Sequence, residues 1–158
     1  MGNIKILICC HKQSIVPDSE IMLPIEVGAD LRSRHIEGYI QDNTGDNISA
    51  KNKMYCELTA QYWAWKNLDA DYYGFFHYRR YLNFSENKYP LDSWQNITEE
   101  RLNDTCLKKY NLNDDCIRNL VETYDIVLSE EKNVAKMPDR NTSVYEQYKN
   151  GRSLNCLL

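Results

Sequence analysis

Two groups of basic side chains stand directly after apolar segments of this sequence. His11 and Lys12 follow the run 4–10, and His77-Tyr78-Arg79-Arg80 follows the run 71–76. Lysine, arginine and imidazole N–H groups bind phosphate oxygens and stabilise the charge of a departing diphosphate. The first group also fits an ordinary solvated strand end, and the second fits a structural ion-pair cluster. Each group is therefore a candidate anion site.

The segment Asp42–Asn47 is a third candidate. It is dense in turn-forming residues and leads to Ser49, the expected N-cap of a helix. Free backbone N–H groups at a helix N-terminus suit a phosphate, although the same composition is typical of a simple turn. In open α/β sheets, ligands bind beyond the carboxyl ends of the strands. The three segments could therefore line one crevice that holds a diphosphate.

Short apolar runs predict an α/β fold with a mostly parallel sheet. Ile4–Cys10 has the length and β-branched content of a buried strand, and residues 24–28 suit a second strand that Gly28 ends. The aromatic run 71–76 predicts a central strand, and Asp125–Leu128 predicts a further one. A strand, a helix and a strand in succession indicate a right-handed βαβ unit.

A helix is expected before the aromatic strand, over Lys53–Leu68. Apolar residues recur there at the three- and four-residue spacing of an amphipathic helix. The stripe that we expect to face the core consists of Met54, Leu58, Tyr62 and Trp65. Trp63 lies off this stripe, which predicts that the helix is covered on more than one side. We expect these aromatic residues to form core rather than a ligand platform.

The later part of the chain carries weaker signals. Residues 83–97 are expected to be irregular. A helix is predicted over 98–109, where acidic residues open the segment and lysines close it, and another is predicted from Asn113. Two helical turns are expected from Val144.

One motif resembles a metal site. Asp69-Ala70-Asp71 matches the D-x-D pattern by which many sugar transferases hold a divalent metal, but it precedes a strand rather than follows one. We therefore predict a helix-to-strand turn there. Oxygen ligands suit Mg²⁺ and Mn²⁺, and no clear carboxylate pair follows a strand of the predicted sheet. No metal ligand is assigned, and a requirement for Mn²⁺ or Mg²⁺ is left open.

Composition narrows the class of protein. The 158 residues fit one domain, and the formal net charge of −4 argues against a nucleic-acid binder. The six cysteines form no C-x-x-C pair, and the apolar run 4–10 is too short for a signal sequence. We therefore expect reduced thiols in a cytosolic protein. The sequence lacks the motifs of common nucleotidases, dehydrogenases, serine hydrolases and zinc proteases.

A series of motifs resembles one protein family. In chain order they are Asp46-Asn47-Ile48-Ser49, Lys51-Asn52, Tyr55-Cys56-Glu57-Leu58-Thr59, Tyr62-Trp63-Ala64-Trp65-Lys66-Asn67, Gly74 and His77-Tyr78-Arg79-Arg80-Tyr81. The sequence resembles a bacterial domain-of-unknown-function family whose members are usually named capsular or exopolysaccharide biosynthesis glycosyltransferases. The resemblance runs from about residue 4 to about residue 148. Residues 150–158 do not resemble the family's continuation, and members are generally longer, so a truncated or frame-shifted product is our hypothesis.

The resemblance implies one nucleotide-sugar-binding domain over residues 1–158, with an incomplete GT-A-like, Rossmann-like fold. The residues expected to bind the donor are His11, Lys12, Lys51, Asn52, His77, Arg79 and Arg80. In an inverting mechanism a carboxylate takes the proton of the acceptor hydroxyl. Asp46 is our candidate for that carboxylate.

The resemblance also implies a substrate class and a place in the cell. It implies transfer of a hexosyl unit, such as galactofuranosyl, from a UDP-linked donor to a polysaccharide or lipid-linked acceptor. Capsule, exopolysaccharide or O-antigen assembly at the cytosolic face of the membrane is the expected setting. Two alternatives stay open: an inactive remnant or binding module of the same machinery, and a nucleic-acid binder through residues 78–81, against which the net charge argues.

Overall fold

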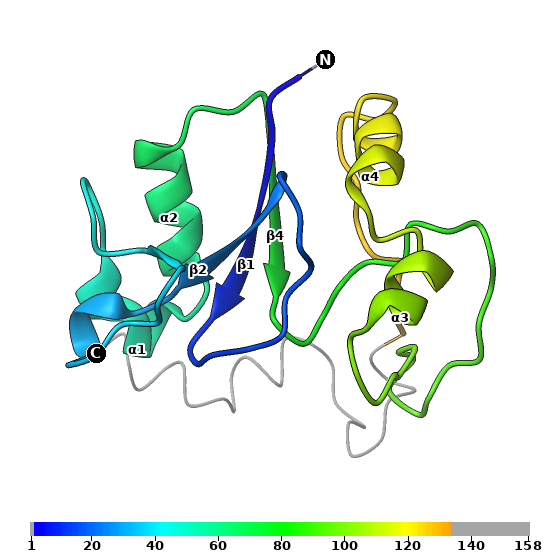
Figure 1. The fold of residues 1–158 in the computed structure, drawn as a ribbon, viewed down its shortest axis with the longest axis horizontal. Helices are drawn as coiled ribbons and strands as arrows, with labels where there is room; N and C mark the ends of the chain where they lie inside the picture. Colours follow the sequence, from blue (N-terminus) through cyan, green and yellow to red (C-terminus); the bar gives the residue numbers. More distant parts are fainter. Residues whose placement is uncertain (1, 134–158) are drawn as a thin grey trace. The chain divides into compact units, whose positions relative to one another are not determined.

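The sheet has four strands that all run parallel. The computed structural model describes residues 2–133, and its strands are β1 (Ile4–Cys10), β2 (Met22–Glu26), β3 (Ile40–Gln41) and β4 (Tyr72–His77). Their order across the sheet is β3-β2-β1-β4 (Figure 1). The expected α/β fold with a parallel sheet is confirmed. The strands predicted at residues 4–10, 24–28 and 71–76 are present, the last two with slightly shifted ends.

β1 lies inside the sheet because its side chains are apolar on both faces. It pairs with β2 on one side and with β4 on the other. The register places Cys10 opposite Glu26 of β2 and Cys9 opposite His77 of β4. The carboxyl ends of these three strands therefore meet at one edge of the sheet.

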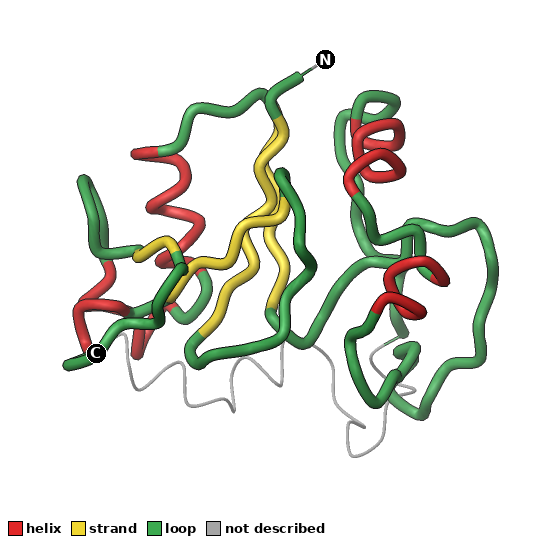
Figure 2. Tube along the Cα trace, viewed as in Figure 1, coloured by secondary structure: helices red, strands yellow, loops and turns green. Residues whose placement is uncertain are grey.

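Each face of the sheet has its own hydrophobic core. Leu7 and Cys9 of β1 pack with α2 (Leu58–Asn67), whereas Ile6 and Ile8 pack in the cluster that contains Ile117 of α4 (Asp114–Val121). Figure 2 shows the parallel strands in yellow and these helices in red. The cysteines Cys9 and Cys10 are buried free thiols, as the sequence predicts for core cysteines.

The helix predicted over Lys53–Leu68 is interrupted. A 3-10 turn, η2 (Ser49–Lys51), leads into α1 (Asn52–Tyr55), and α2 begins only at Leu58. Cys56 lies between the two helices with φ 48° and ψ −128°, which is not a helical conformation. The prediction of one continuous helix is therefore wrong, because the chain turns sharply at a residue that no glycine or proline marks.

The predicted buried stripe of this helix is also wrong. Trp65 is 69% exposed and Trp63 is only 8% exposed. Met54 and Leu58 are exposed as well, and the buried residues of α2 are Thr59, Ala60, Trp63 and Ala64. Small side chains at Ala60 and Ala64 let the helix approach the sheet closely. The face with the smaller residues is therefore the one that packs.

The two later helices begin at asparagine caps. Asn103 accepts a hydrogen bond from the backbone N–H of Cys106 at the start of α3 (Asp104–Lys109), and Asn113 does the same for Cys116 in α4. The helix predicted from residue 98 therefore begins later, because the Thr98 hydroxyl bonds to Asp92 instead of capping a helix. The helix predicted from Asn113 and the irregular segment 83–97 are confirmed.

The strand predicted at Asp125–Leu128 is wrong. The segment has no strand pairing, and Ile126 and Leu128 are exposed. Strand preference reflects packing against neighbouring strands, which this segment lacks within the described residues. The helical turns predicted from Val144, the thiol of Cys156 and the segment 150–158 lie outside the described residues.

The chain divides into two compact units. Residues 1–85 and 102–127 form the first, which contains the sheet. In the second, the Asp92 carboxylate accepts hydrogen bonds from the backbone N–H of Trp94 and Asn96 and from the Thr98 hydroxyl. Between residues 2 and 133, no helix is long and apolar enough to cross a bilayer.

Candidate functional site

The basic residues that the sequence singled out gather at the carboxyl edge of the sheet. His11 and Lys12 follow β1, and Arg79 follows β4 by two residues. Because β1 and β4 are parallel neighbours, their ends lie side by side. The structure therefore brings together two groups that are far apart in the sequence.

Tyr78 is the centre of this basic cluster. Its buried ring lies edge-on to the His11 imidazole, with ring centroids 5.1 Å apart. The Lys12 ammonium lies 5.7 Å and the Arg79 guanidinium 5.2 Å from the centre of the same ring. Cations over an aromatic face are stabilised by the negative face of the ring. Tyr78 thus has three basic side chains around its ring, and His77 stacks against it with centroids 4.3 Å apart.

Hydrogen bonding fixes the proton of His77. The backbone N–H of Arg79 donates to Nδ1 of His77 at 3.2 Å, so that nitrogen acts as an acceptor. The neutral ring therefore carries its proton on Nε2. Burial lowers the pKa of His77, the Glu57 carboxylate opposes this shift, and Arg80, Arg79 and His11 add to it. His77 is therefore kept neutral and available as a donor.

Glu57 faces His77 from the start of α2. Its Oε1 lies 3.8 Å from Nε2 of His77. At this distance the N–H of the neutral ring faces the carboxylate without a direct hydrogen bond. Sequence reasoning did not single out Glu57, although it belongs to the motif 55–59, because spacing along the chain gives no sign that it meets β4.

The backbone at Cys56 sets the position of Glu57. A non-glycine residue with φ 48° and ψ −128° is strained, and such strain concentrates at functional sites. The surrounding bonds hold it: the Asn52 side chain donates to the Cys56 carbonyl at 2.8 Å, and Thr59 N–H donates to the same oxygen at 3.2 Å. The chain between α1 and α2 therefore aims Glu57 at the cluster.

Lys51 and Asn52 lie beside the end of β2 rather than against Tyr78. Gly28 has φ 68°, and a Cβ atom there would come within 2.8 Å of the Asn52 side chain. Only glycine suits this left-handed, crowded position. Lys51 is exposed.

Arg80 continues the turn after β4, donating its N–H to the His77 carbonyl at 2.8 Å.

Two buried carboxylates support the same edge. Asp42 accepts hydrogen bonds from the backbone N–H of Gly28 and Ala29 and from the hydroxyls of Ser49 and Thr59. Ser49 therefore does not cap a helix, as the sequence predicted, because its hydroxyl donates to Asp42. The segment Asp42–Asn47 is therefore a structural turn whose first residue, Asp42, is buried and hydrogen-bonded to its neighbours.

The second buried carboxylate is Glu26, at the end of β2. Its oxygens lie 3.2 Å from Arg32 Nε and 3.2 Å from His35 Nδ1, and it accepts a hydrogen bond from the backbone N–H of Ile36. Sequence reasoning missed this group. The sequence signal for this group is a glutamate inside the apolar run 24–28. A charge that is buried with its strand requires partners elsewhere in the chain.

Asp46 lies apart from the basic cluster. It accepts a hydrogen bond from the Tyr62 hydroxyl at 3.0 Å, and its backbone bonds to the Asn67 side chain. Tyr62 lies in the middle of α2 and Asn67 is its last residue, whereas Glu57 precedes its first residue. The structure therefore does not bring Asp46 to the residues with which the sequence grouped it, and its role as a base stays a prediction.

The D-x-D motif lies at the opposite edge of the sheet. Asp71 accepts a hydrogen bond from the Asn3 backbone at 2.7 Å, between the end of α2 and the start of β4. The predicted helix-to-strand turn is confirmed. Within residues 2–133, no group of three or more His, Cys, Asp or Glu side chains is arranged to hold a metal ion.

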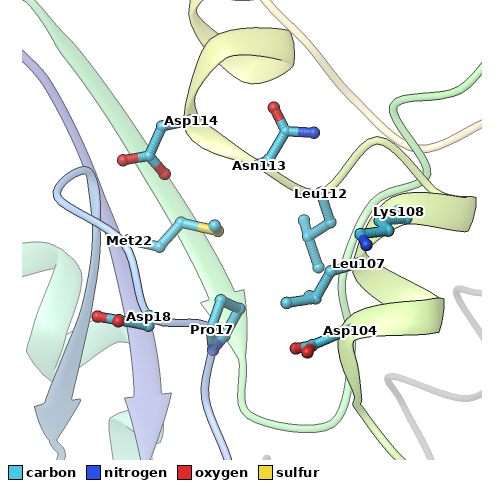
Figure 3. Close-up of a pocket in the computed structure, with 9 residues that line it drawn as sticks. All are labelled: Pro17, Asp18, Met22, Asp104, Leu107, Lys108, Leu112, Asn113 and Asp114. Atoms are coloured by element: carbon cyan, nitrogen blue, oxygen red, sulfur yellow. The ribbon is translucent and has the colours of Figure 1, made fainter.

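The cavity drawn in Figure 3 is a poor site for an anion. It has a volume of about 280 Å³ and lies beside the start of β2, at the other end of that strand from the basic cluster. Its charged lining consists of Asp18, Asp104, Asp114 and Lys108. Three carboxylates repel a phosphate, so the candidate site for an anion is the carboxyl edge of the sheet and not this cavity.

Comparisons with known proteins agree with this architecture. The sequence profile described as "Domain of unknown function (DUF4422)" matches residues 5–158, and the chain belongs to this family. The match includes residues 150–158, so the prediction that the resemblance stops near residue 148 is wrong. None of the curated proteins compared with the chain matches it.

A solved structure is similar to most of this chain. It is the apo structure of the WbbM bifunctional glycosyltransferase, 40% identical, with a TM-score of 0.84. The similarity covers 94% of this chain and 26% of the WbbM chain. The expected GT-A-like α/β fold is confirmed as that of part of a glycosyltransferase. The chain spans about a quarter of the length of this relative.

Proposed function

We propose that this chain binds the diphosphate of a nucleotide-sugar donor at the carboxyl edge of its sheet, as part of a glycosyltransferase. The observation that carries the proposal is the convergence of His11, Lys12 and Arg79 on the Tyr78 ring. Three N–H donor groups of this kind suit the two phosphates of a donor and stabilise the charge of the leaving diphosphate. The 40% identity to a glycosyltransferase supports the same reaction class.

Each expected donor residue has a role in this proposal. Lys12 and Arg79 supply positive charge, His11 supplies a further N–H donor beside them, and His77 packs its ring against Tyr78. Arg80 adds charge beside them. Lys51 and Asn52, near Gly28 at the end of β2, line the approach along the edge toward the nucleotide.

The finer features of the proposal follow the family resemblance. The donor is a UDP-linked hexose, such as UDP-galactofuranose, and the acceptor is a polysaccharide or lipid-linked sugar. The reaction belongs to capsule, exopolysaccharide or O-antigen assembly. It takes place in the cytoplasm, with the protein associated with the inner face of the membrane.

A second candidate function is donor binding without transfer. The observation that favours it is the position of Asp46, which contacts Tyr62 and Asn67 of α2 and not the basic residues that follow β1 and β4. In this case the chain is a binding module of the polysaccharide machinery. Release of UDP from a UDP-sugar by the purified chain would exclude this candidate.

Titration with UDP tests the proposal. A ligand at a hundred times its dissociation constant stabilises a protein by about 2.7 kcal/mol, so we expect a clear rise in the unfolding temperature. Lys12→Ala and Arg79→Ala should each weaken UDP binding about tenfold, or about 1.4 kcal/mol. Lys109→Ala, which removes the same charge from α3, is the control. Repeating the titration with Mn²⁺ measures metal dependence.

The proposal fails if the folded wild-type chain shows no shift with UDP. Equal weakening by Lys109→Ala and Arg79→Ala would also contradict it, because general charge and not the Tyr78 cluster would then be responsible.

A further inference from the structure

Glu57 lies where a carboxylate could act on a bound donor. It stands between α1 and α2, and its side chain is 48% exposed beside the partly buried His77. The strained backbone of Cys56 precedes it, and Thr59 and Asn52 hold that turn from both sides. Backbone strain that the surrounding bonds maintain is typical of functional sites.

His77 presents a proton to Glu57. Since Nδ1 of His77 accepts from the Arg79 backbone, the proton of the neutral ring is on Nε2, the nitrogen that faces the Glu57 carboxylate at 3.8 Å. The imidazole N–H therefore faces the carboxylate and positions it.

We infer that Glu57 is the catalytic base of the transfer reaction and that His77 is its positioning residue. The inference rests on the proposed function. The Glu57 carboxylate takes the proton of the acceptor hydroxyl as the hydroxyl oxygen bonds to the anomeric carbon of the donor sugar. The bond from that carbon to the diphosphate oxygen breaks, and its electron pair leaves on UDP, next to Lys12 and Arg79.

The geometry favours Glu57 over Asp46 for this role. A helix of the length of α2 rises by about 15 Å from end to end, at about 1.5 Å per residue. Glu57 precedes the first residue of α2, whereas Asp46 contacts Tyr62 in the middle of the helix and Asn67, its last residue. Glu57, at the start of the helix, approaches the end of β4 through His77.

UDP release tests the inference with water as the acceptor. The purified chain is incubated with UDP-glucose, UDP-galactose and UDP-galactofuranose together, and free UDP is measured. General bases contribute about 10²–10⁴-fold, so Glu57→Gln should lower turnover by at least about a hundredfold. UDP affinity and the unfolding temperature should stay close to wild type. Formate should restore part of the activity of Glu57→Ala, because it supplies a carboxylate that a structural role would not need.

Matched variants make the outcome decisive. Glu20→Gln removes one exposed carboxylate at the other end of β2 and should not alter turnover. A loss in Asp46→Asn with full activity in Glu57→Gln would assign the base to Asp46 and overturn the inference. The inference would also be overturned if the wild-type protein bound UDP but released no UDP from these three donors. Wild type that does not bind UDP would instead contradict the proposed donor site.

Discussion

The carboxylate of Asp42 accepts a hydrogen bond of 2.6 Å from the hydroxyl of Thr59, which joins the end of β3 to the first turn of α2. Asp42 is completely buried and also accepts bonds from Gly28, Ala29 and Ser49. One carboxylate thus ties the ends of two strands to both helical segments beside the site. The geometry of the carboxyl edge depends on this anion.

Asp42→Asn should therefore destabilise the protein strongly. The amide group keeps the shape of the carboxylate but directs N–H groups at donors, so at least two bonds are lost. Hydrogen bonds to charged groups are worth about 1.5–3 kcal/mol each, so we expect a loss of at least about 3 kcal/mol. Urea unfolding measures it. Asp46→Asn, at an exposed carboxylate of the same loop, should change stability by no more than about 0.5 kcal/mol. Equal losses would show that Asp42 is not the organising anion.

The two tryptophans of α2 should differ sharply in their contribution to stability. Trp63 is 8% exposed and donates to the Thr44 hydroxyl, whereas Trp65 is 69% exposed. Trp63→Ala should cost about 3–5 kcal/mol, because it leaves a cavity against the sheet. Trp65→Ala should cost less than about 1 kcal/mol. Urea unfolding of both variants checks this, and a larger loss for Trp65 would restore the stripe that the sequence predicted.

The error over α2 shows what periodicity determines and what it does not. Helical spacing is present on both faces of the segment, so it predicts a helix but not the face that packs. The prediction chose the face with larger apolar residues, which includes Leu58 and Trp65. The face that packs instead contains Ala60 and Ala64, whose small side chains allow a closer approach to the sheet. The break at Cys56 had no sequence signal, since a non-glycine residue with positive φ is uncommon.

Strands and their ends were predicted better than the partners at those ends. β1 and β4 follow from apolar composition, and placing His11 and Arg79 at one edge needs only the parallel pairing of those strands. Glu57 directly precedes α2, and its position at this edge depends on how α2 packs against the sheet. Its contact with His77 therefore could not be predicted from spacing along the chain. The partners of Asp42 and Glu26 likewise depend on the path of the loops, which periodicity does not describe.

Thiol reactivity should separate the exposed Cys56 from Cys9 and Cys10, which are buried in β1. Burial raises the pKa of Cys9 to about 12 and that of Cys10 to about 11. Both thiols are therefore protonated and shielded at pH 8, while Cys56 is exposed. Brief treatment with iodoacetamide at pH 8, followed by peptide mass spectrometry, should modify Cys56 and spare Cys9 and Cys10. In urea all three should react. Modification of Cys9 in the folded protein would contradict the buried position of β1.

His77 should make stability fall as the pH is lowered. Burial holds the pKa of His77 below its ordinary value of 6.5, and Arg80, Arg79 and His11 act in the same direction, while Glu57 opposes them. The unfolded chain therefore binds a proton more readily than the folded one. The stability that neutral His77 provides is complete above pH 6.5 and is lost as the pH falls from 6.5 toward the lowered value.

Proton titration by NMR tests this directly. The His77 signal should titrate below pH 6.5 in the wild type and at a still lower pH in Glu57→Gln, because that variant loses the one charge that favours the imidazolium. His77→Gln should weaken the loss of stability between pH 7 and the pH at which His77 titrates. A rise of the His77 pKa in Glu57→Gln would contradict the pairing of these two side chains.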